Sequence, residues 1–406
     1  MIPEREVDAV RKGLLILCTV LLAALSVFLF VIVFPADGPA LPALSPTDVP
    51  ASAPAAAPVP TQAEREASAA DQLLASMTLE QKVGQLFWAR CPESGAAEEI
   101  GQYSPAGYIL FGRDFEGRTQ QEVIQNIQTF QDAAAVPMLI GVDEEGGTVV
   151  RASKYLRDTP FASPQKVYAA RGMNGIVSDT REKDAFLKSL GINVNLAPVA
   201  DVSTDTSNFI YPRTFGQSAA RTADYVASVV RTMQEDGMGN VLKHFPGYGP
   251  NEDTHTGVAV DQRSLDTFRR QDLLPFQAGI DAGADAVLVS HTIVKAFDSN
   301  RPASLSPAIY QLLRDSLGFE GVAVTDDLAM DAIHRYTGDT DAAVLAVQAG
   351  SSLLISSDLP TQFEAVYQAA EQGSIPSDTI DAAVRRVLLW KISLGLIPLA
   401  DETAQP

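Results

Sequence analysis

Cysteine and positive charge are both scarce in this chain. It has two cysteines in 406 residues: Cys18 lies within an apolar run, and Cys91 stands alone. Such a pair provides neither a disulfide framework nor a cysteine-based metal site. There are 30 Lys and Arg against 50 Asp and Glu, a formal net charge of −20, and the basic residues occur at most in adjacent pairs. A surface that follows phosphates needs a basic patch, so we expect no nucleic-acid partner.

Charge is absent from residues 13–34, a run of apolar residues long enough to span a bilayer as a helix. The apolar region of a signal peptide is shorter, roughly 7 to 15 residues. Arg5, Arg11 and Lys12 precede the run, and no Lys or Arg follows it before Arg65. This bias predicts a cytoplasmic tail at 1–12, a transmembrane signal anchor at 13–34, and a single-pass cell-membrane protein whose remainder is extracytoplasmic. A cleaved signal peptide is the alternative.

Residues 35–62 are rich in proline and alanine and predict a linker. Eight prolines lie between Pro35 and Pro60, a composition that favours extended segments and builds no core. The globular domain is expected at 63–401. It opens with a helical pattern at 63–77, and Thr78 with Gln81 then fits a capping box at the start of a second helix.

Short apolar runs alternate with longer helical patterns through the rest of the domain. This alternation predicts a parallel sheet covered by helices. The expected strands are 85–90, 108–111, 138–143, 192–199, 240–245, 286–291, 321–326 and 352–357. Eight such strands predict an α/β fold of the (β/α)8, TIM-like barrel type. An open doubly wound sheet is the alternative, but no G-x-G-x-x-G follows the first strand and there is no P-loop.

Polar residues lie at or directly after the C-terminal ends of four of these strands, where the active sites of such barrels lie. They are Asp143 with Glu144 and Glu145, Lys243 with His244, His291, and Asp326 with Asp327. Each one alone could be a solvated loop residue or a helix cap. Together they predict a polar pocket at one end of the barrel.

The motifs of metal-dependent and serine hydrolases are missing: the chain has no H-E-x-x-H and no G-x-S-x-G. Carboxylates and imidazoles remain, a combination that suits cleavage of a glycosidic bond. In the triplet Asp253-Thr254-His255, an extended backbone would put Asp253 and His255 on the same side. The carboxylate could then orient the imidazole for proton transfer. The alternative is an Asx-turn at a loop tip.

With these residues assembled, the chain resembles glycoside hydrolase family 3, and within it the β-N-acetylglucosaminidase (β-hexosaminidase) branch. The resemblance runs from about Asp71 to Ile397. The motifs that carry it, in order, are "MTLEQKVGQLF", "GYILFGRDF", "GVDEEGGTVVR", "NVNLAPVADV", "PRTFG", "KHFPGYG", "DTH", "VLVSHT", "PASLS" and "LGFEGVAVTDDLAM".

The resemblance implies roles for individual residues. Asp326 would be the nucleophile that forms a covalent glycosyl-enzyme, and His255 the acid/base, with Asp253 as its orienting partner. The residues it implies for sugar binding are Asp143, Arg213, Lys243 and His244, with His291 at the pocket floor and Met330 in its lining. For Met330, a place in the hydrophobic core is equally expected. No cofactor and no metal ion is implied.

The chain departs from the family pattern at three points. Tyr248 stands where "KHFPGHG" has its second histidine, and the spacing from Lys243 to His255 is one residue shorter than in the commoner form of the loop. Thr148 replaces the arginine of "EGGRV". These departures concern closure of the catalytic loop and recognition of the leaving group.

The resulting functional hypothesis is an exo-acting retaining β-N-acetylhexosaminidase that releases terminal β-linked N-acetylglucosamine from extracytoplasmic glycans, with peptidoglycan fragments as one substrate class. Three alternatives remain open. Two keep the fold: a β-N-acetylglucosaminide phosphorylase, since an imidazole would not repel phosphate, and a β-glucosidase. The third is a catalytically silent wall-binding module. The sequence makes no prediction about oligomeric state.

Overall fold

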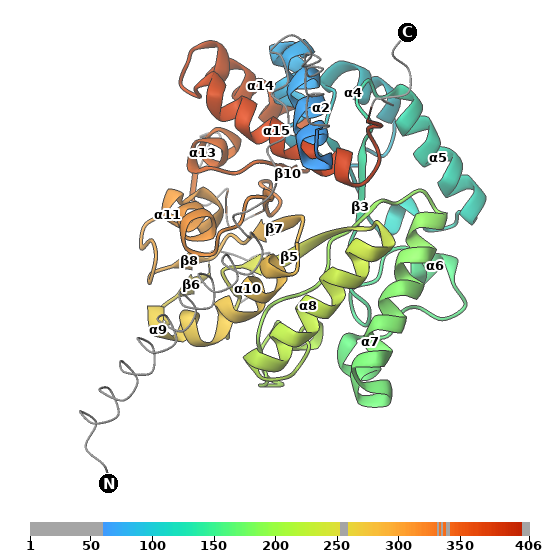
Figure 1. Ribbon diagram of the computed structural model, residues 1–406, viewed down its shortest axis with the longest axis vertical. Helices are drawn as coiled ribbons and strands as arrows, with labels where there is room; N and C mark the ends of the chain where they lie inside the picture. Colours follow the sequence, from blue (N-terminus) through green and yellow to red (C-terminus); the bar gives the residue numbers. More distant parts are fainter. Residues whose placement is uncertain (1–59, 252–258, 331–332, 334–335, 338–341, 400–406) are drawn as a thin grey trace, which may run out of the picture. The chain divides into compact units, whose positions relative to one another are not determined.

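The computed structural model describes residues 60–251, 259–330, 333, 336–337 and 342–399 (Figure 1). The predicted cytoplasmic tail at 1–12, the predicted anchor at 13–34 and all but the end of the predicted linker lie outside these residues. Within them, no helix is both long and apolar enough to cross a bilayer.

An eight-stranded parallel sheet forms the centre of the domain, in the order β10-β1-β2-β3-β4-β5-β7-β9. A parallel bridge between Val324 and Leu353 joins its two outer strands, so the sheet closes into a barrel. All eight predicted strands and the predicted barrel are confirmed. The strands are β1 Phe87–Arg90, β2 Gly107–Leu110, β3 Leu139–Val142, β4 Val194–Asn195, β5 Gly239–Phe245, β7 Ala286–Val289, β9 Val322–Thr325 and β10 Leu354–Ser356.

β4 is shorter than the predicted strand at 192–199. Pro198 has no N–H to donate to a sheet, and regular pairing ends before it. A second, two-stranded parallel sheet, which the sequence did not predict, pairs β6 (Val260–Asp261) with β8 (Ile293–Val294).

Helices lie between the successive strands and cover the barrel; α7, α8 and α10 pack against one another in series (Figure 1). The helices are α2 Gln62–Ser76, α3 Leu79–Gly84, α4 Ala96–Tyr103, α5 Gln120–Ala133, α6 Ser153–Leu156, α7 Pro164–Ser189, α8 Ala219–Asp236, α9 Leu265–Thr267, α10 Leu273–Asp281, α11 Pro307–Gln311, α13 Ala342–Ala349, α14 Leu359–Glu371 and α15 Ser377–Ser393. Single 3-10 or π turns are η1 Gly112–Asp114, η2 Tyr211–Arg213, η3 Phe268–Asp272, η4 Ala303–Leu305 and η5 Leu312–Ser316.

Capping residues set the start of the first two helices. The Thr61 side chain accepts a hydrogen bond from the Glu64 N–H, so α2 begins one residue before the predicted boundary. The predicted capping box of Thr78 and Gln81 is confirmed at the start of α3. α2 packs against α15, where Arg385 pairs with Asp71 at 2.5 Å.

Side chains alternate along each strand between two hydrophobic cores. On β1, Phe87 and Ala89 pack outward against the helices, while Trp88 points into the barrel. The inner core includes Trp88, Ile109, Leu139, Val194, Leu196, Val241, Leu288, Val324 and Ile355. Along each strand, the position two residues after an inner-core residue also points inward. At the C-terminal end of a strand, this position lies at the barrel mouth. Arg90, Phe111, Lys243 and Asp326 occupy such positions, and Asp143 occupies the corresponding one on β3.

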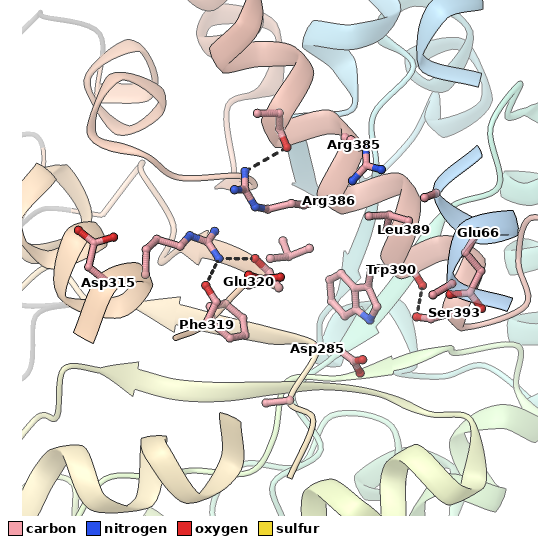
Figure 2. Close-up of a pocket in the computed structure, with 17 residues that line it drawn as sticks. Glu66, Asp285, Asp315, Phe319, Glu320, Arg385, Arg386, Leu389, Trp390 and Ser393 are labelled. Carbon is pink, nitrogen blue, oxygen red and sulfur yellow. Dashed lines mark hydrogen bonds between the residues drawn. The ribbon is translucent and has the colours of Figure 1, made fainter. Parts of the chain in front are cut away.

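A cavity of about 900 Å³ lies at the opposite, N-terminal end of the strands, between α2, η5 and α15 (Figure 2). Asp285, Arg314, Arg386 and Trp390 are among its lining residues. None of the predicted site residues that the structure describes lines it, and its lining includes both guanidinium and carboxylate groups. The polar residues at the C-terminal ends of the strands lie at the other end of the barrel.

Candidate active site

Lys243 lies at the centre of a buried charged cluster. Its Nζ is 2.6 Å from Asp143 Oδ1 and 2.6 Å from Glu145 Oε1. The Lys243 side chain is almost fully buried, whereas that of Asp143 is 19% exposed. Asp143 is thus the carboxylate of this cluster that reaches the open side of the barrel mouth.

Arg213 extends the cluster from η2. Its guanidinium holds Glu145 in two hydrogen bonds, at 3.0 and 2.7 Å. Burial alone would raise the pKa of Glu145, but the charges of Lys243 and Arg213 outweigh it and hold this pKa well below its usual range. Burial would likewise lower the pKa of Arg213, and Glu145 reverses that effect. Glu145 and Arg213 are therefore both charged at neutral pH.

His244 joins the cluster as a neutral imidazole. Arg213 can only donate hydrogen bonds, so the contact of 3.0 Å between its Nη2 and His244 Nε2 makes Nε2 the acceptor. The proton then lies on Nδ1, which donates to Asp201 Oδ2 at 2.7 Å. The predicted residues Asp143, Arg213, Lys243 and His244 thus form one connected group, called the charged cluster below together with Glu145.

Tyr248, at the position of the missing histidine, is buried. Its ring packs edge-on against the His244 ring at 5.4 Å between centroids, and its backbone N–H donates to Asp201 Oδ1 at 2.7 Å. Its aromatic ring therefore helps to fix His244 in place.

Sequence reasoning missed Asp201 and assigned no role to Glu144 or Arg151. Asp201 follows β4 as the other polar residues follow their strands, and that signal could have revealed it. The Glu144 carboxylate accepts hydrogen bonds from the backbone N–H groups of Arg151, Ala152 and Ser153, which fixes the loop after β3. The Nε of Arg151 is buried and has no hydrogen-bond partner among the described residues, so Arg151 is an additional candidate for binding a ligand.

The two glycines of "EGG" make that loop possible. Gly146 and Gly147 have φ values of 94° and 71°, a region that side chains rarely adopt. The turn brings Gly146 into a bridge with Val149 and leaves Thr148 exposed.

Asp326 and Asp327, directly after β9, have different environments. Asp326 occupies the inward position and is partly exposed; its Oδ1 accepts a hydrogen bond from the Asp327 N–H at 2.9 Å. The Asp327 carboxylate instead binds the N–H groups of Ala329 and Ser357, at 3.0 and 3.1 Å, and the Ser357 hydroxyl. Asp327 therefore ties the end of β9 to the end of β10, and Asp326 is the carboxylate directed to the mouth.

His291 and Met330 are both buried beside this carboxylate pair. His291 Nε2 donates to the Asp327 carbonyl at 2.9 Å, and its Nδ1 contacts the Ser304 hydroxyl at 2.7 Å. Met330 is 8% exposed and donates its N–H to the Asp327 carbonyl. Both residues support the segment that carries Asp326.

Asp253 and His255 lie outside the described residues, so their predicted role stays a prediction. The two ends of their segment are anchored. Asn251 Nδ2 donates to the Tyr248 carbonyl at 2.7 Å and to Asp261 Oδ2 at 2.6 Å. On the other side, Ala259 precedes β6, which pairs with β8 shortly after His291. Asn251 is thus bonded to Tyr248, whose ring packs against His244, and the Ala259 carbonyl accepts a hydrogen bond from the N–H of Ile293, two residues beyond His291.

The family model for the N-terminal domain of glycosyl hydrolase family 3 matches residues 78–389. The chain belongs to glycosyl hydrolase family 3. That match includes every predicted site residue.

Similar proteins in this family are glycosidases. A β-hexosaminidase of Stenotrophomonas maltophilia (strain K279a) is 39% identical over 241 residues, which are 57% of this chain and 70% of the relative. A β-hexosaminidase of Xylella fastidiosa (strain M23) is 32% identical over 70% of this chain and 86% of its own. This family 3 member is accordingly a glycoside hydrolase.

Solved structures support the same branch. A family 3 β-N-acetylglucosaminidase from Paenibacillus sp. str. FPU-7 superposes with a TM-score of 0.75 at 32% identity; the match covers 81% of this chain and 65% of that one. The β-N-acetylhexosaminidase from Beutenbergia cavernae matches with a TM-score of 0.70 at 30% identity, over 77% of this chain and 98% of its own. A β-glucoside phosphorylase at 23% identity shares the fold.

Proposed function

We propose that this family 3 glycosidase is an exo-acting retaining β-N-acetylhexosaminidase that releases terminal β-linked N-acetylglucosamine. The observation that carries the proposal is the placement of Asp326. It lies inward at the mouth of the barrel that also holds the charged cluster, while its neighbour Asp327 is fully engaged with backbone and hydroxyl donors. The β-hexosaminidases among the relatives support the choice of sugar.

In the proposed complex, the charged cluster holds the terminal sugar. Asp143 accepts hydrogen bonds from ring hydroxyls, and Lys243 and Arg213 donate to neighbouring oxygens. Charge-assisted hydrogen bonds of this kind are about twice as strong as neutral ones. Because Glu145 and Asp201 keep the two cations and His244 fixed before the sugar arrives, little reorganisation is needed on binding.

The proposed reaction has two steps. Asp326 attacks the anomeric carbon while His255, oriented by Asp253, protonates the leaving oxygen, which gives a covalent glycosyl ester. His255 then takes a proton from water, and the water oxygen displaces Asp326. Two inversions at the same carbon retain the β configuration.

Trapping the covalent intermediate tests the proposal. The full-length protein is incubated with a 5-fluoro-N-acetylglucosaminyl fluoride, which reacts and hydrolyses slowly, and is then digested for mass spectrometry. We expect the sugar on the peptide that contains Asp326, and no label in Asp326→Asn. A label on another carboxylate, or an α-configured first product, would rule the assignment out.

A phosphorylase is the second candidate because the predicted acid/base is an imidazole, which does not repel phosphate. Turnover of an aryl β-N-acetylglucosaminide with and without inorganic phosphate separates the two reactions. Free N-acetylglucosamine in both conditions supports hydrolysis, whereas N-acetylglucosamine 1-phosphate supports the phosphorylase. A parallel rate on the aryl β-glucoside tests the glucosidase alternative, and equal, negligible rates for wild type and Asp326→Asn would indicate a silent binding module.

The proposed location is the outer face of the cell membrane, with residues 13–34 as the anchor and 35–62 as the linker. The motivation is the uncharged apolar run and the basic residues before it. In this setting peptidoglycan fragments are the proposed substrate class. Membrane fractions washed with alkaline carbonate should retain the protein, and external protease should digest the barrel in spheroplasts. Release by the wash, or protection from the protease, would contradict this location.

A further inference from the structure

Arg90 is a cation at the barrel mouth to which no role has been assigned. It is the last residue of β1, two positions beyond Trp88 of the inner core. Residues two apart on a strand share a face, so the Arg90 side chain points inward, at the end of the barrel that holds Asp143, Lys243 and Asp326. Phe111 occupies the equivalent position on β2, two residues beyond Ile109.

The Arg90 guanidinium rests on the Phe111 ring, with its Cζ 4.6 Å from the ring centroid. Such stacking fixes the plane of a guanidinium and leaves its edge available to a planar anion. The Nε of Arg90 is buried and has no hydrogen-bond partner among the described residues. No ion pair between Arg90 and a described carboxylate forms either, although the residue as a whole is partly exposed.

This environment contrasts with that of the charged cluster. Lys243 contacts two carboxylates there, and Arg213 is held by Glu145 in two hydrogen bonds. The charge of Arg90 acts on the Asp114 carboxylate, but Asp114 accepts a hydrogen bond from the Phe111 N–H and is also close to Arg113 and Arg118.

Arg90 therefore carries a positive charge that forms no ion pair with a described carboxylate. In the order of the sheet, β1 and β5 are four places apart, so Arg90 and Lys243 face each other across the barrel. The interior of an eight-stranded barrel is just wide enough for side chains to fill. A sugar held by the charged cluster on β3 and β5 thus has Arg90 on the opposite side of the mouth.

We propose that Arg90, stacked on Phe111, binds a carboxylate carried by the leaving-group part of the substrate. The inference rests on the proposed function, because it assumes that the charged cluster holds the terminal sugar. A carboxylate matches the two parallel N–H groups that a guanidinium edge presents, and one bidentate pair gives both affinity and orientation. The charged cluster determines which terminal sugar is released, and Arg90 determines which leaving group the enzyme accepts.

Three disaccharides test the proposal with the full-length protein: N-acetylglucosaminyl-β-1,4-N-acetylmuramic acid, its methyl ester, and N,N′-diacetylchitobiose. The acid and the ester differ by one negative charge and one methyl group. We expect wild type to cleave the acid with a kcat/KM about tenfold or more above that of the ester, as one charge-assisted pair allows. Arg90→Met should reduce this ratio to about 1, with the rate on diacetylchitobiose changed less than about twofold, as a loss of one specific contact requires.

Two further variants complete the comparison. Arg118→Met removes a positive charge from the same electrostatic neighbourhood, since both arginines act on Asp114, and should keep the wild-type ratio. Arg90→Lys keeps the charge without the planar edge and should give an intermediate ratio. The rate on diacetylchitobiose also reports whether each variant is folded.

Equal rates on acid and ester in wild type, or an unchanged ratio in Arg90→Met, would overturn the proposal. So would formation of N-acetylglucosamine 1-phosphate that depends on Arg90, because the bound oxyanion would then be the acceptor phosphate. Binding of the acid and the ester to Asp326→Asn, measured by calorimetry, gives the same comparison without turnover. Loss of all turnover in wild type would therefore count against the proposed function, while the binding ratio still decides the role of Arg90.

Discussion

Arg213 donates a hydrogen bond to His244 Nε2 at 3.0 Å, and this single contact fixes the protonation state of the imidazole. The proton lies on Nδ1, where Asp201 accepts it at 2.7 Å. A chain of contacts from Glu145 through Arg213 and His244 to Asp201 thus connects the segments that follow β3 and β4 with η2 and β5.

Replacing Asp201 should disturb this chain at its buried end. In Asp201→Asn, the new amide nitrogen faces either the Tyr248 N–H at the Oδ1 position or both the backbone N–H and Nδ1 of His244 at the Oδ2 position, so at least one N–H donor loses its acceptor. An unsatisfied buried group costs roughly 1–3 kcal/mol, and the tautomer of His244 is no longer enforced. We expect a lower free energy of unfolding by about that amount and at least a tenfold lower kcat/KM on an aryl β-N-acetylglucosaminide. Denaturant titration and steady-state kinetics measure the two effects.

Asp205→Asn is the matched control, since Asp205 is an exposed carboxylate in the same loop. It should leave both quantities near their wild-type values. An active, fully stable Asp201→Asn would show that Asp201 does not position His244.

The pair Asp326 and Asp327 gives a second prediction, with opposite effects for the same substitution. Asp326→Asn should abolish hydrolysis with little change in Tm, because an amide oxygen can keep the hydrogen bond that the carboxylate accepts from the Asp327 N–H. Asp327→Asn should lower the Tm, since it weakens contacts with Ala329 and Ser357 that tie β9 to β10. Thermal unfolding and initial rates of both variants separate the roles.

Chemical rescue sharpens this comparison. Azide should restore turnover in Asp326→Gly and yield the α-glycosyl azide, because a small anion replaces the missing nucleophile on the same face. If Asp327→Gly is rescued instead, the two roles have been exchanged.

The barrel and half of its site could be predicted from the sequence because both depend on local pattern. Each strand is an apolar run, and Asp143, Lys243 and Asp326 follow such runs directly. The parallel topology then brings these strand ends to one mouth, so a residue's place along its strand predicts its place in the site.

The contacts between side chains from different parts of the sequence could not be predicted in the same way. Which carboxylate holds Arg213 depends on a contact across 68 positions in the sequence, and Glu145 fills that role through a turn that needs two left-handed glycines. The position of Arg90 could not be predicted for the same reason. From the sequence it resembles a surface charge, and only the structure shows that its side chain points into the barrel and packs on the Phe111 ring.

The environment of Asp184 leads us to expect that the free energy of unfolding falls as the pH rises. It lies on α7 beside Asp236 of α8, and burial, with the negative charge of Asp236, raises its pKa to about 8 against the smaller opposing effects of Lys183 and Lys188. Its two oxygens and Asp236 Oδ2 find no donor among the described residues, which a proton on Asp184 would supply. The folded protein keeps a proton that the unfolded chain releases near pH 4, so this contribution is complete below about pH 4 and lost towards about pH 8.

Asp184→Asn should therefore raise the Tm, by about 4 °C or more at pH 8, and the gain over wild type should shrink as the pH falls. The measurement is Tm against pH for wild type and variant. Asp224→Asn, an exposed carboxylate on α8, is the control and should show no such trend. A gain that does not change with pH would mean that Asp184 is already ionised at neutral pH.

For Lys391 we expect the opposite pH dependence: its contribution to the free energy of unfolding becomes more favourable as the pH rises. It lies on α15 with no exposed surface, its Nζ donates to Gln85 Oε1 at 2.7 Å, and burial lowers its pKa to about 7. The unfolded chain keeps the lysine proton up to about pH 10.4, whereas the folded protein gives it up above about pH 7. Burying the charge thus costs stability fully below pH 7, and the cost disappears as the pH rises towards 10.

Lys391→Met should consequently stabilise the protein most at pH 6 and lose this advantage by about pH 10, where the variant is less stable by roughly 1 kcal/mol because Gln85 has lost its donor. Lys154→Met, at an exposed position, should leave the Tm unchanged across the same range. The difference in Tm between variant and wild type cancels the titrations that both share, including that of Asp184. If this difference in Tm is constant from pH 6 to pH 10, Lys391 stays protonated in the folded state, and an anion close to it must balance its charge.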